Sequence, residues 1–214
     1  MGPCDKAKEF LSTGDKFRLG ELTTESFHPL TQSLSELAKY NLPKAIKVLK
    51  EVDQQALESM SKALPQIEKM AEDVRATLTS GGRIFLCGCG ATGRLSLTLE
   101  SLWRKSFPNQ ESVKAFMAGG DIALVHAVEG FEDFPDFGGR QLEQLGFKED
   151  DLLISCTEGG ETPFVIGATL KAGDISNRSP YFLFCNQKKL LMEKVERSRQ
   201  VLSDPSIHSL EIFV

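Results

Sequence analysis

The stretch that decides the fold is residues 83–117, RIFLCGCGATGRLSLTLESLWRKSFPNQESVKAFM. It begins with an apolar run at 83–88, turns through a glycine-rich segment, continues with helical spacing at 92–105 and ends in a second apolar run at 112–117. Continuous apolar strands that alternate with helices are typical of a parallel sheet covered on both faces. This stretch therefore predicts the first two strands of such a sheet and the helix between them.

The same alternation continues to the end of the chain. Further strands are predicted at 151–156, 180–185 and 210–214, and helices at 121–128, 138–145, 162–172 and 188–195. The fold class is α/β, a three-layer α/β/α sandwich with a mostly parallel sheet and an N-terminal helical segment. Because the last predicted strand stops at Val214 with no element after it, we expect the chain to be part of a longer protein.

Before the sheet, the sequence has a helical period. From about Ser33 to Ser80 the apolar residues recur every three or four positions, which predicts two or three linked helices. Leu64-Pro65 marks a joint, because the residue before a proline is pushed out of the helical region. The predicted organisation is a partly irregular leader at 1–32, a helical segment at 33–80 and an α/β domain at 81–214, truncated at its C-terminus.

Composition limits the classes of partner. The 214 residues include 25 Lys and Arg against 30 Asp and Glu, with no basic block, so nucleic acid is not an expected partner. The apolar runs are far shorter than the roughly 20 residues of a membrane helix, so no membrane association is expected either. The start MGPCDKAKEF does not read as a secretory signal, and the cysteine count is odd, at five. Reduced thiols and a cytoplasmic location are expected.

No cofactor or metal site is predicted. Cys87 and Cys89 form a C-x-C pair, but no second Cys or His pair stands nearby, so core packing is the favoured interpretation. The basic segment Lys194–Arg199 reads as a solvated helix end.

Two turns follow apolar runs and precede helices. In an open parallel sheet, ligands bind outside the carboxyl ends of the strands. The first turn, Gly88–Arg94, contains glycines that let backbone N–H groups approach an anion, and Thr92 adds a hydroxyl. The second turn, Thr157–Pro163, has a Thr-Pro helix start. These turns are expected to face one another across a shared cavity.

The first turn also matches the dinucleotide pattern Gly88-x-Gly90-x-x-Gly93. That interpretation requires an acidic residue about 20 positions further on, at the end of the second strand. Glu111 precedes the strand and Asp121 lies beyond the expected position. Nucleotide binding therefore stays a minor alternative, beside a plain tight turn without a ligand.

Three segments together resemble a known family. They are GRIFLCGCGATGRLSLTLESLWRKSF at 82–107, AGGDIALVHAVEGFED at 118–133 and DDLLISCTEGGETPFVIGATL at 150–170. They resemble the sugar isomerase (SIS) domain, in particular the branch of the bacterial N-acetylmuramic acid 6-phosphate etherases and the glucokinase regulatory proteins. The upstream TTESFHPLTQSLSEL at 23–37 is similar to the leader of that branch. The similarity extends roughly from Leu22 to Cys185.

The resemblance implies a site for a phosphosugar or amino-sugar derivative at the two turns. Glu132 matches a carboxylate that acts as a base in the etherases and contacts sugar hydroxyls in the regulatory proteins. The implied ligand-binding residues are Gly90, Ala91, Thr92, Gly93, Glu132, Thr157, Glu158, Gly159 and Thr162.

Three departures from the etherase pattern matter. Leu102 stands where the etherases carry a second acid, and Glu100 is expected to pair with Arg104 on the surface instead. In the second turn, Gly159 and Glu161 replace a Ser and an Arg. Carboxylates there would repel a phosphate, so either they turn outward or the pocket prefers a neutral or differently oriented ligand. The third departure concerns a Ser-Ser-Arg-Met segment that completes the site in this branch. It would fall just after residue 214 and is therefore not in this sequence.

The predicted function is therefore a carbohydrate-binding sensor or regulator like the glucokinase regulatory proteins. The alternative is an etherase-type carbon–oxygen lyase, or another sugar-phosphate isomerase or lyase, with Glu132 as its catalytic base. The resemblance also implies pairing, as a homodimer or as tandem SIS domains, and a sugar kinase as a possible partner. The helices at 42–80 could provide the pairing surface or pack on the chain's own sheet.

Overall fold

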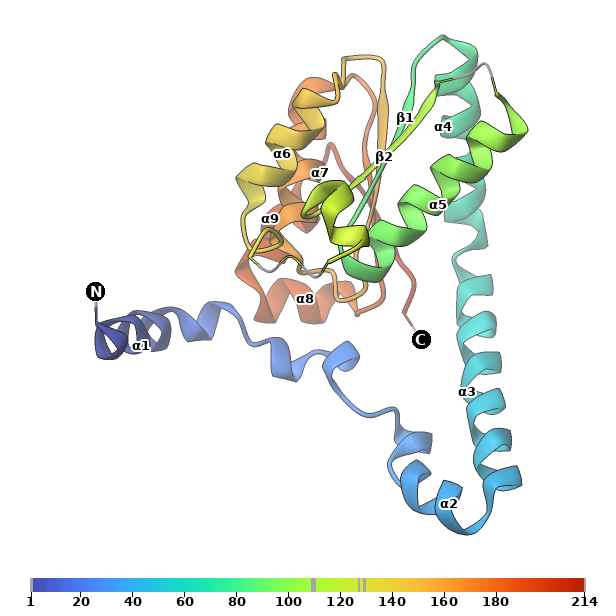
Figure 1. The fold of residues 1–214 in the computed structure, drawn as a ribbon, viewed down its shortest axis with the longest axis vertical. Coiled ribbons are helices and arrows are strands. Elements are labelled where there is room, and N and C mark those ends of the chain that lie inside the picture. The colour runs from blue at the N-terminus through green and yellow to red at the C-terminus, as the bar shows by residue number, and fades with distance from the viewer. Residues whose placement is uncertain (1, 109–110, 127, 129, 214) are drawn as a thin grey trace.

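A computed structural model describes residues 2–108, 111–126, 128 and 130–213. In this part of the chain, five parallel strands form one sheet in the order β2-β1-β3-β4-β5 (Figure 1). The strands are β1 (Ile84–Gly88), β2 (Val113–Met117), β3 (Leu152–Cys156), β4 (Tyr181–Phe184) and β5 (His208–Glu211). The predicted α/β class and parallel sheet are confirmed.

The strand order explains where a ligand could bind. From β1 the chain first crosses to β2 on one side and then returns to β3 on the other side, so β1 and β3 are neighbours whose following loops diverge. In parallel sheets such a switch point leaves a crevice at the carboxyl ends of the two strands. The two predicted turns follow these two strands.

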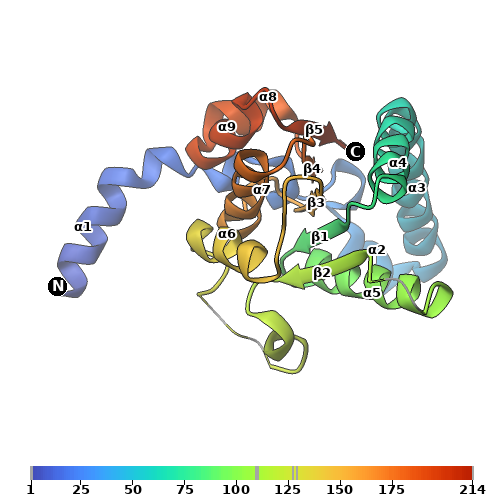
Figure 2. The same cartoon turned by 90° about the horizontal axis from the view of Figure 1, so that it is seen from above.

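Helices cover both faces of the sheet (Figure 2). One face carries α6 (Pro135–Gln144), α7 (Pro163–Ile175), α8 (Lys188–Lys194) and α9 (Glu196–Ser203), and the other carries α4 (Leu64–Thr79) and α5 (Gly90–Ser106). The three predicted layers are therefore present. α7 is mostly apolar and lies in the centre of its layer, as expected for a helix that is buried on most sides.

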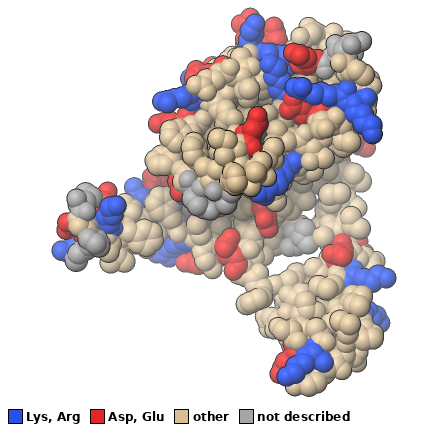
Figure 3. Space-filling model, in the orientation of Figure 1, with Lys and Arg blue, Asp and Glu red and all other residues tan. Residues whose placement is uncertain are grey.

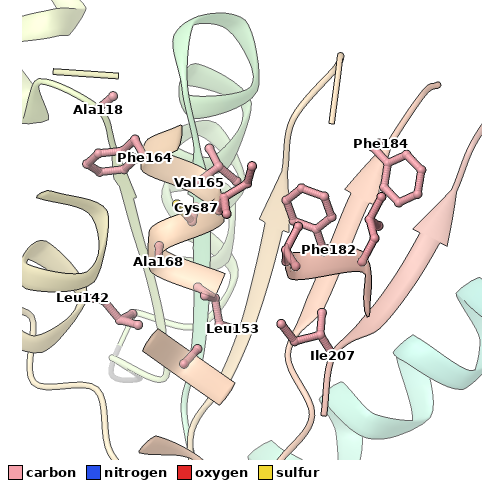
Figure 4. Close-up of a cluster of buried hydrophobic side chains, with 14 of the residues drawn as sticks. Cys87, Ala118, Leu142, Leu153, Phe164, Val165, Ala168, Phe182, Phe184 and Ile207 are labelled. Atoms are coloured by element: carbon pink, nitrogen blue, oxygen red, sulfur yellow. The ribbon is translucent and has the colours of Figure 1, made fainter. Parts of the chain in front are cut away.

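The larger core lies between the sheet and α7 (Figure 4). Phe164 from α7 meets Phe116 from β2 at a ring-centroid distance of 6.0 Å, and Phe182 and Phe184 of β4 are fully buried. Each such side chain contributes about 1.5–3 kcal/mol through burial. This core fixes the start of α7, and with it the loop that follows β3.

The predicted helical segment forms three helices, α2 (Leu34–Tyr40), α3 (Leu42–Lys62) and α4. The joint between α3 and α4 lies at Ala63, one residue before the predicted position, because Pro65 is tolerated in the first turn of α4. Only α4 packs on the sheet, through Met70, Val74 and Leu78. α3 extends away from the sheet with α2 at its far end, and this projecting part shows mostly uncharged surface (Figures 1 and 3). Exposed apolar residues of α3 are Leu42, Ile46, Leu49, Leu57 and Met60.

The middle of the leader is held against the α/β layers, whereas α1 (Pro3–Thr13) projects away from them (Figures 1 and 2). The leader begins with α1 and continues through the short 3-10 helices Gly14–Lys16, Leu19–Glu21, Thr23–Glu25 and Pro29–Thr31. Leu22 is fully buried in the larger core, and the Arg18 amide donates to the carbonyl of Lys194 at 3.2 Å. The part of the leader around Arg18 and Leu22 therefore packs as part of the α/β domain.

Several predicted details were wrong. Lys194–Arg199 is no solvated helix end, because Val195 and Ser198 are fully buried. β5 begins at His208 rather than at 210, and the predicted helix at 121–128 is a 3-10 helix at Gly120–Leu124. Within the described residues, no helix has the length and apolarity that crossing a bilayer requires.

Candidate functional site

The two predicted turns line one cavity of about 350 Å³. The loop after β1, the loop after β3, the segment before α6 and the leader all contribute to its wall. The lining residues are Thr24, Glu25, Cys89, Gly90, Ala91, Thr92, Glu132, Thr157, Glu158, Gly159, Glu161 and Thr162. The structure thus brings together every predicted site residue except Gly93, and it adds Thr24 and Glu25 from the leader.

A second cavity, of about 400 Å³, lies beside α4. Tyr181 and His208 line it, and they are the first residues of β4 and β5. It therefore lies at the amino ends of the strands, away from the edge where parallel sheets bind ligands.

The loop after β1 is tightly built. Gly90 has a positive φ of 53°, which favours glycine, and a Cβ on Gly88 would come within 2.4 Å of the Thr92 carbonyl carbon. The Thr92 hydroxyl accepts from the Cys89 amide at 3.0 Å and donates to the Cys89 carbonyl at 2.8 Å. This hydroxyl closes the first turn of α5, so Gly90 and Ala91 present the helix start to the cavity.

Gly93 has a different position. It is buried, and a Cβ there would lie 2.6 Å from the Cβ of Met117 on β2. Glycine at this position lets α5 approach the sheet closely, which is the packing role of the third glycine in such turns. Gly93 therefore supports the loop from below the cavity wall.

The loop after β3 is held by its own threonines. The buried Thr157 hydroxyl lies 2.9 Å from the Thr162 hydroxyl, and the Thr157 amide donates to the carbonyl of Leu183 at 3.0 Å. Gly160 has a φ of 78°, and a Cβ there would come within 2.6 Å of Leu191. The loop is therefore pinned against β4 and α8.

Two buried polar residues that sequence reasoning missed fix the same loop. Asn186 donates to the Gly159 carbonyl at 2.8 Å and to the Thr24 hydroxyl at 2.9 Å, and its side-chain oxygen accepts from the Thr24 amide. Ser198 donates to the Gly160 carbonyl at 2.8 Å. Asn186 lies two residues after the end of β4, at the carboxyl edge of the sheet, and this position was the one available signal. Its bond to the leader is a long-range contact that no sequence pattern indicates.

Glu132 is brought to the cavity by two contacts. Its carbonyl accepts from the amide of Phe164, in the first turn of α7, at 2.9 Å. One carboxylate oxygen lies 2.9 Å from the Cys89 sulfur. Burial, together with this carboxylate, raises the pKa of the Cys89 thiol to about 12, so the thiol is protonated at neutral pH and donates to Glu132.

The two carboxylates predicted in the second turn behave differently. Glu158 is exposed on the cavity wall. Glu161 forms an ion pair with Arg197 of α9. The predicted conflict between carboxylates and an anion is therefore reduced at Glu161.

The structure places no second acid at Leu102, whose side chain is 55% exposed on α5. Glu100 pairs with Arg104 as predicted, but the expectation of a surface pair is wrong for its carboxylate. That carboxylate is mostly buried, because it also accepts from the amide of Ala115 on the edge strand β2 at 2.8 Å. Glu100 thus binds β2 and does not line the cavity.

The described residues hold no cluster of three metal-ligating side chains. Cys87 is buried in the core as predicted, whereas Cys89 is half-buried at the cavity. The groups available for a ligand are therefore backbone amides, hydroxyls and carboxylates.

Solved structures with a similar fold are phosphosugar isomerases by name. A phosphoheptose isomerase from Francisella tularensis matches with a TM-score of 0.58 at 19% identity, over 79% of this chain and 86% of that one. A phosphoheptose isomerase from Neisseria gonorrhoeae matches with a TM-score of 0.53 at 14% identity, over 78% and 85% of the two chains. At these identities the likeness concerns the fold alone.

Curated relatives are more similar in sequence. N-acetylmuramic acid 6-phosphate etherase 1 of Bacillus licheniformis is 30% identical over 88% of this chain and 61% of its own length. The etherase of Glaesserella parasuis is 32% identical over 73% of this chain and 51% of its own length. The chain thus spans about half to three-fifths of the length of these relatives.

The sequence model of one family matches residues 65–172, which include α4, β1, β2 and β3 and most of α7. This family is described as the glucokinase regulatory protein N-terminal SIS domain. The match covers slightly more than half of the chain and both cavity loops, and it confirms the resemblance found in the sequence. The chain therefore belongs to the SIS domain family, in its glucokinase regulatory protein type.

Proposed function

We propose that this chain binds a phosphosugar or amino-sugar derivative between the loops after β1 and β3, and that it acts as a sensor or regulator rather than as an enzyme. The observation that carries this proposal is the shared cavity, which is lined by the starts of α5 and α7 and by Glu132. Helix starts offer backbone N–H groups to an anion. The carboxylate of Glu132 offers oxygens that accept from sugar hydroxyls.

The proposed binding mode has two halves. The phosphate contacts the amides at Gly90 and Ala91 and the hydroxyls at Thr157 and Thr162, and the sugar ring lies toward Glu132. The names of the relatives support this ligand class, because both the etherases and the isomerases act on phosphorylated sugars by name. The half-buried Cys89 thiol holds the Glu132 carboxylate in place for the ring hydroxyls.

The regulator is favoured over the lyase by the missing second acid. An elimination that cleaves the ether and releases lactate needs a base to take a proton from the sugar and a donor to protonate the leaving oxygen. Leu102 provides no proton, and Glu100 is engaged with Arg104 and the backbone of β2. Glu132 alone therefore supports binding better than turnover.

An etherase-type lyase is the second candidate, and the names of the curated relatives favour it. Its base would be Glu132, and its acid would have to come from another cavity carboxylate, such as Glu25 or Glu158. Incubation with N-acetylmuramic acid 6-phosphate and assay of released lactate separates the two candidates. The regulator predicts no lactate above a Glu132→Gln control. Sustained release that is lost in this variant would establish the lyase instead.

Ligand binding is tested by thermal shift with fructose 1-phosphate, fructose 6-phosphate and N-acetylmuramic acid 6-phosphate. A ligand at 100 times its dissociation constant stabilises the folded state by about 2.7 kcal/mol. We expect a rise in melting temperature with at least one of the three, and no rise with the corresponding unphosphorylated sugars. A flat response to all three would contradict the proposed function in either form.

Pairing with a second copy of this chain, at α3, is also part of the proposal. The face of α3 that carries Leu49 and Met60 is exposed, whereas α4 already packs on the sheet. Sedimentation velocity of a Leu49→Glu/Met60→Glu variant should show a smaller species than the unchanged chain. A matched Leu11→Glu control on α1, where Leu11 is also exposed, should keep the original size. A cytoplasmic location and a sugar kinase as a further partner complete the proposal.

A further inference from the structure

Glu161 stands at a position that is unfavourable for an anion site. It lines the cavity one residue before Thr162, the N-cap of α7, so its charge faces the same space as the helix start. A free carboxylate there would compete with an anionic ligand for the amides of α7 and would repel it. The sequence alone therefore predicted a conflict with a phosphosugar.

Arg197 resolves this conflict from a distant part of the chain. Its guanidinium, 36 residues further on and in α9, forms an ion pair with the Glu161 carboxylate. Only 23% of the Glu161 side chain and 25% of the Arg197 side chain is exposed, so solvent screens this pair less than a surface pair. The two charges cancel to first order at the cavity.

The arginine is itself held in position by the structure around it. Its guanidinium carbon lies 5.2 Å from the ring centroid of Phe17, within cation–π distance. The neighbouring Ser198 bonds the Gly160 carbonyl of the cavity loop. Phe17 in turn forms an isolated antiparallel β-bridge with Val195, the residue before α9. The leader, α9 and the loop after β3 therefore form one rigid unit around the ion pair.

We propose that Arg197 is a positioning residue for phosphate recognition: it neutralises Glu161 and holds its carboxylate aside, so that the loop after β3 accepts a phosphate dianion. This inference rests on the proposed function and deepens it, because it assigns the preference for phosphorylated over unphosphorylated sugar to the Glu161–Arg197 pair. The compensating cation comes from α9, because the loop after β3 contains no Lys or Arg between residues 157 and 162.

The test is a set of titration calorimetry measurements with fructose 6-phosphate, fructose and inorganic phosphate. The proteins are the unchanged chain and the variants Arg197→Gln, Glu161→Gln and Arg197→Gln/Glu161→Gln. The matched control is Arg199→Gln, which lies on the same helix but bonds the carbonyls of Met192 and Glu193. Melting temperatures of all five proteins report whether each one folds.

We expect Arg197→Gln to lower the affinity for fructose 6-phosphate and for phosphate about tenfold, which corresponds to about 1.4 kcal/mol of binding free energy. Its effect on fructose should be small, because fructose carries no charge. Glu161→Gln should bind phosphate as tightly as the unchanged chain or more tightly. The double variant should bind the phosphorylated probes as tightly as Glu161→Gln does, because the repelling carboxylate is absent from both. Arg199→Gln should bind them as the unchanged chain does.

Two outcomes would overturn the inference while leaving the proposed function intact. In one, the double variant binds fructose 6-phosphate as weakly as Arg197→Gln, which indicates that Arg197 only supports the fold. In the other, a folded Arg197→Gln variant binds fructose 6-phosphate as tightly as the unchanged chain does. If the unchanged chain binds none of fructose 1-phosphate, fructose 6-phosphate and N-acetylmuramic acid 6-phosphate, the proposed function fails, and the inference fails with it.

Discussion

The sulfur of Cys89 lies 2.9 Å from a carboxylate oxygen of Glu132, a contact between residues 43 positions apart in the sequence. It joins the loop after β1 to the segment before α6, across the mouth of the cavity. The Glu132 backbone is fixed by α7 through the amide of Phe164. Glu132 is therefore held by the loop after β1 and by the first turn of α7 before any ligand arrives, which lowers the ordering cost of binding.

The first prediction concerns thiol reactivity. Because burial and Glu132 raise the pKa of Cys89 to about 12, native Cys89 should react with iodoacetamide at pH 8 far more slowly than in the unfolded chain. Glu132→Gln removes one of the causes and should speed the reaction. Glu158→Gln, which changes another cavity carboxylate, is the control and should leave the rate unchanged. Peptide mapping by mass spectrometry measures the rates, and a native rate equal to the unfolded one would contradict the assigned contact.

The second prediction concerns alkaline stability. Burial raises the pKa of the Cys156 thiol to about 11 and that of the Cys89 thiol to about 12. Thiols in the unfolded chain ionise near pH 9. Above pH 9 the unfolded state thus holds fewer protons than the folded state, so the free energy of unfolding must fall as pH rises from 9 toward 11–12. Urea denaturation at pH 7, 9 and 10.5 measures this decrease. Cys156→Ser should make the decrease shallower, and a free energy that rises over this interval would refute the prediction.

The third prediction concerns the buried ion pair at the start of the sheet. Asp151 accepts from the backbone amide of Arg83 at 2.8 Å, from its guanidinium, and from the amide of Lys148 at 2.8 Å. Its side chain is only 4% exposed. Asp151→Ala should therefore lower the free energy of unfolding by about 3–5 kcal/mol, because it takes the carboxylate partner from the partly buried Arg83 guanidinium and the acceptor from two backbone amides.

The control for Asp151 is Asp15→Ala, which removes an exposed carboxylate that is also paired with an arginine, Arg18. Such surface pairs contribute about 0–1 kcal/mol. Urea denaturation of both variants gives the comparison. Similar losses of unfolding free energy in the two variants would contradict the prediction that the buried pair stabilises the fold more than the surface pair does.

The fourth prediction separates packing from binding at the first loop. Gly93→Ala would place its Cβ 2.6 Å from the Cβ of Met117 and should destabilise the fold by about 1–3 kcal/mol through overpacking. Gly20→Ala, where a Cβ meets nothing within 4 Å, should change stability little. Thermal melts measure both. An unchanged melting temperature for Gly93→Ala would contradict the close approach of α5 to β2.

Much of the fold could be predicted because its signals are local. The apolar run, glycine-rich turn and helix of residues 83–105 determine β1 and α5 within a few residues. β5 was predicted at 210–214 from its apolar residues, but pairing with β4 begins at His208, opposite Tyr181. Register depends on the neighbouring strand, so the apolar pattern alone placed this strand two residues late.

The cavity loops were predictable for the same reason, whereas their supports were not. Asn186, Ser198 and Arg197 act through contacts with residues 27 or more positions away. Polar residues in a basic helical segment normally face solvent, and nothing in the local sequence marks Ser198 as buried. Leu22 shows the same limit, because only the folded leader brings it into the larger core.

The most direct test of the central claim is titration of the unchanged chain with fructose 1-phosphate, fructose 6-phosphate and N-acetylmuramic acid 6-phosphate, beside Thr157→Val and a matched Thr98→Val. Thr157 lines the cavity, whereas the Thr98 hydroxyl bonds its own helix at Arg94. We predict saturable binding of at least one phosphosugar, weakened about tenfold or more by Thr157→Val and unchanged by Thr98→Val. Absence of binding to all three, or equal affinities in the folded variants, would contradict the claim that the two loops hold a phosphosugar.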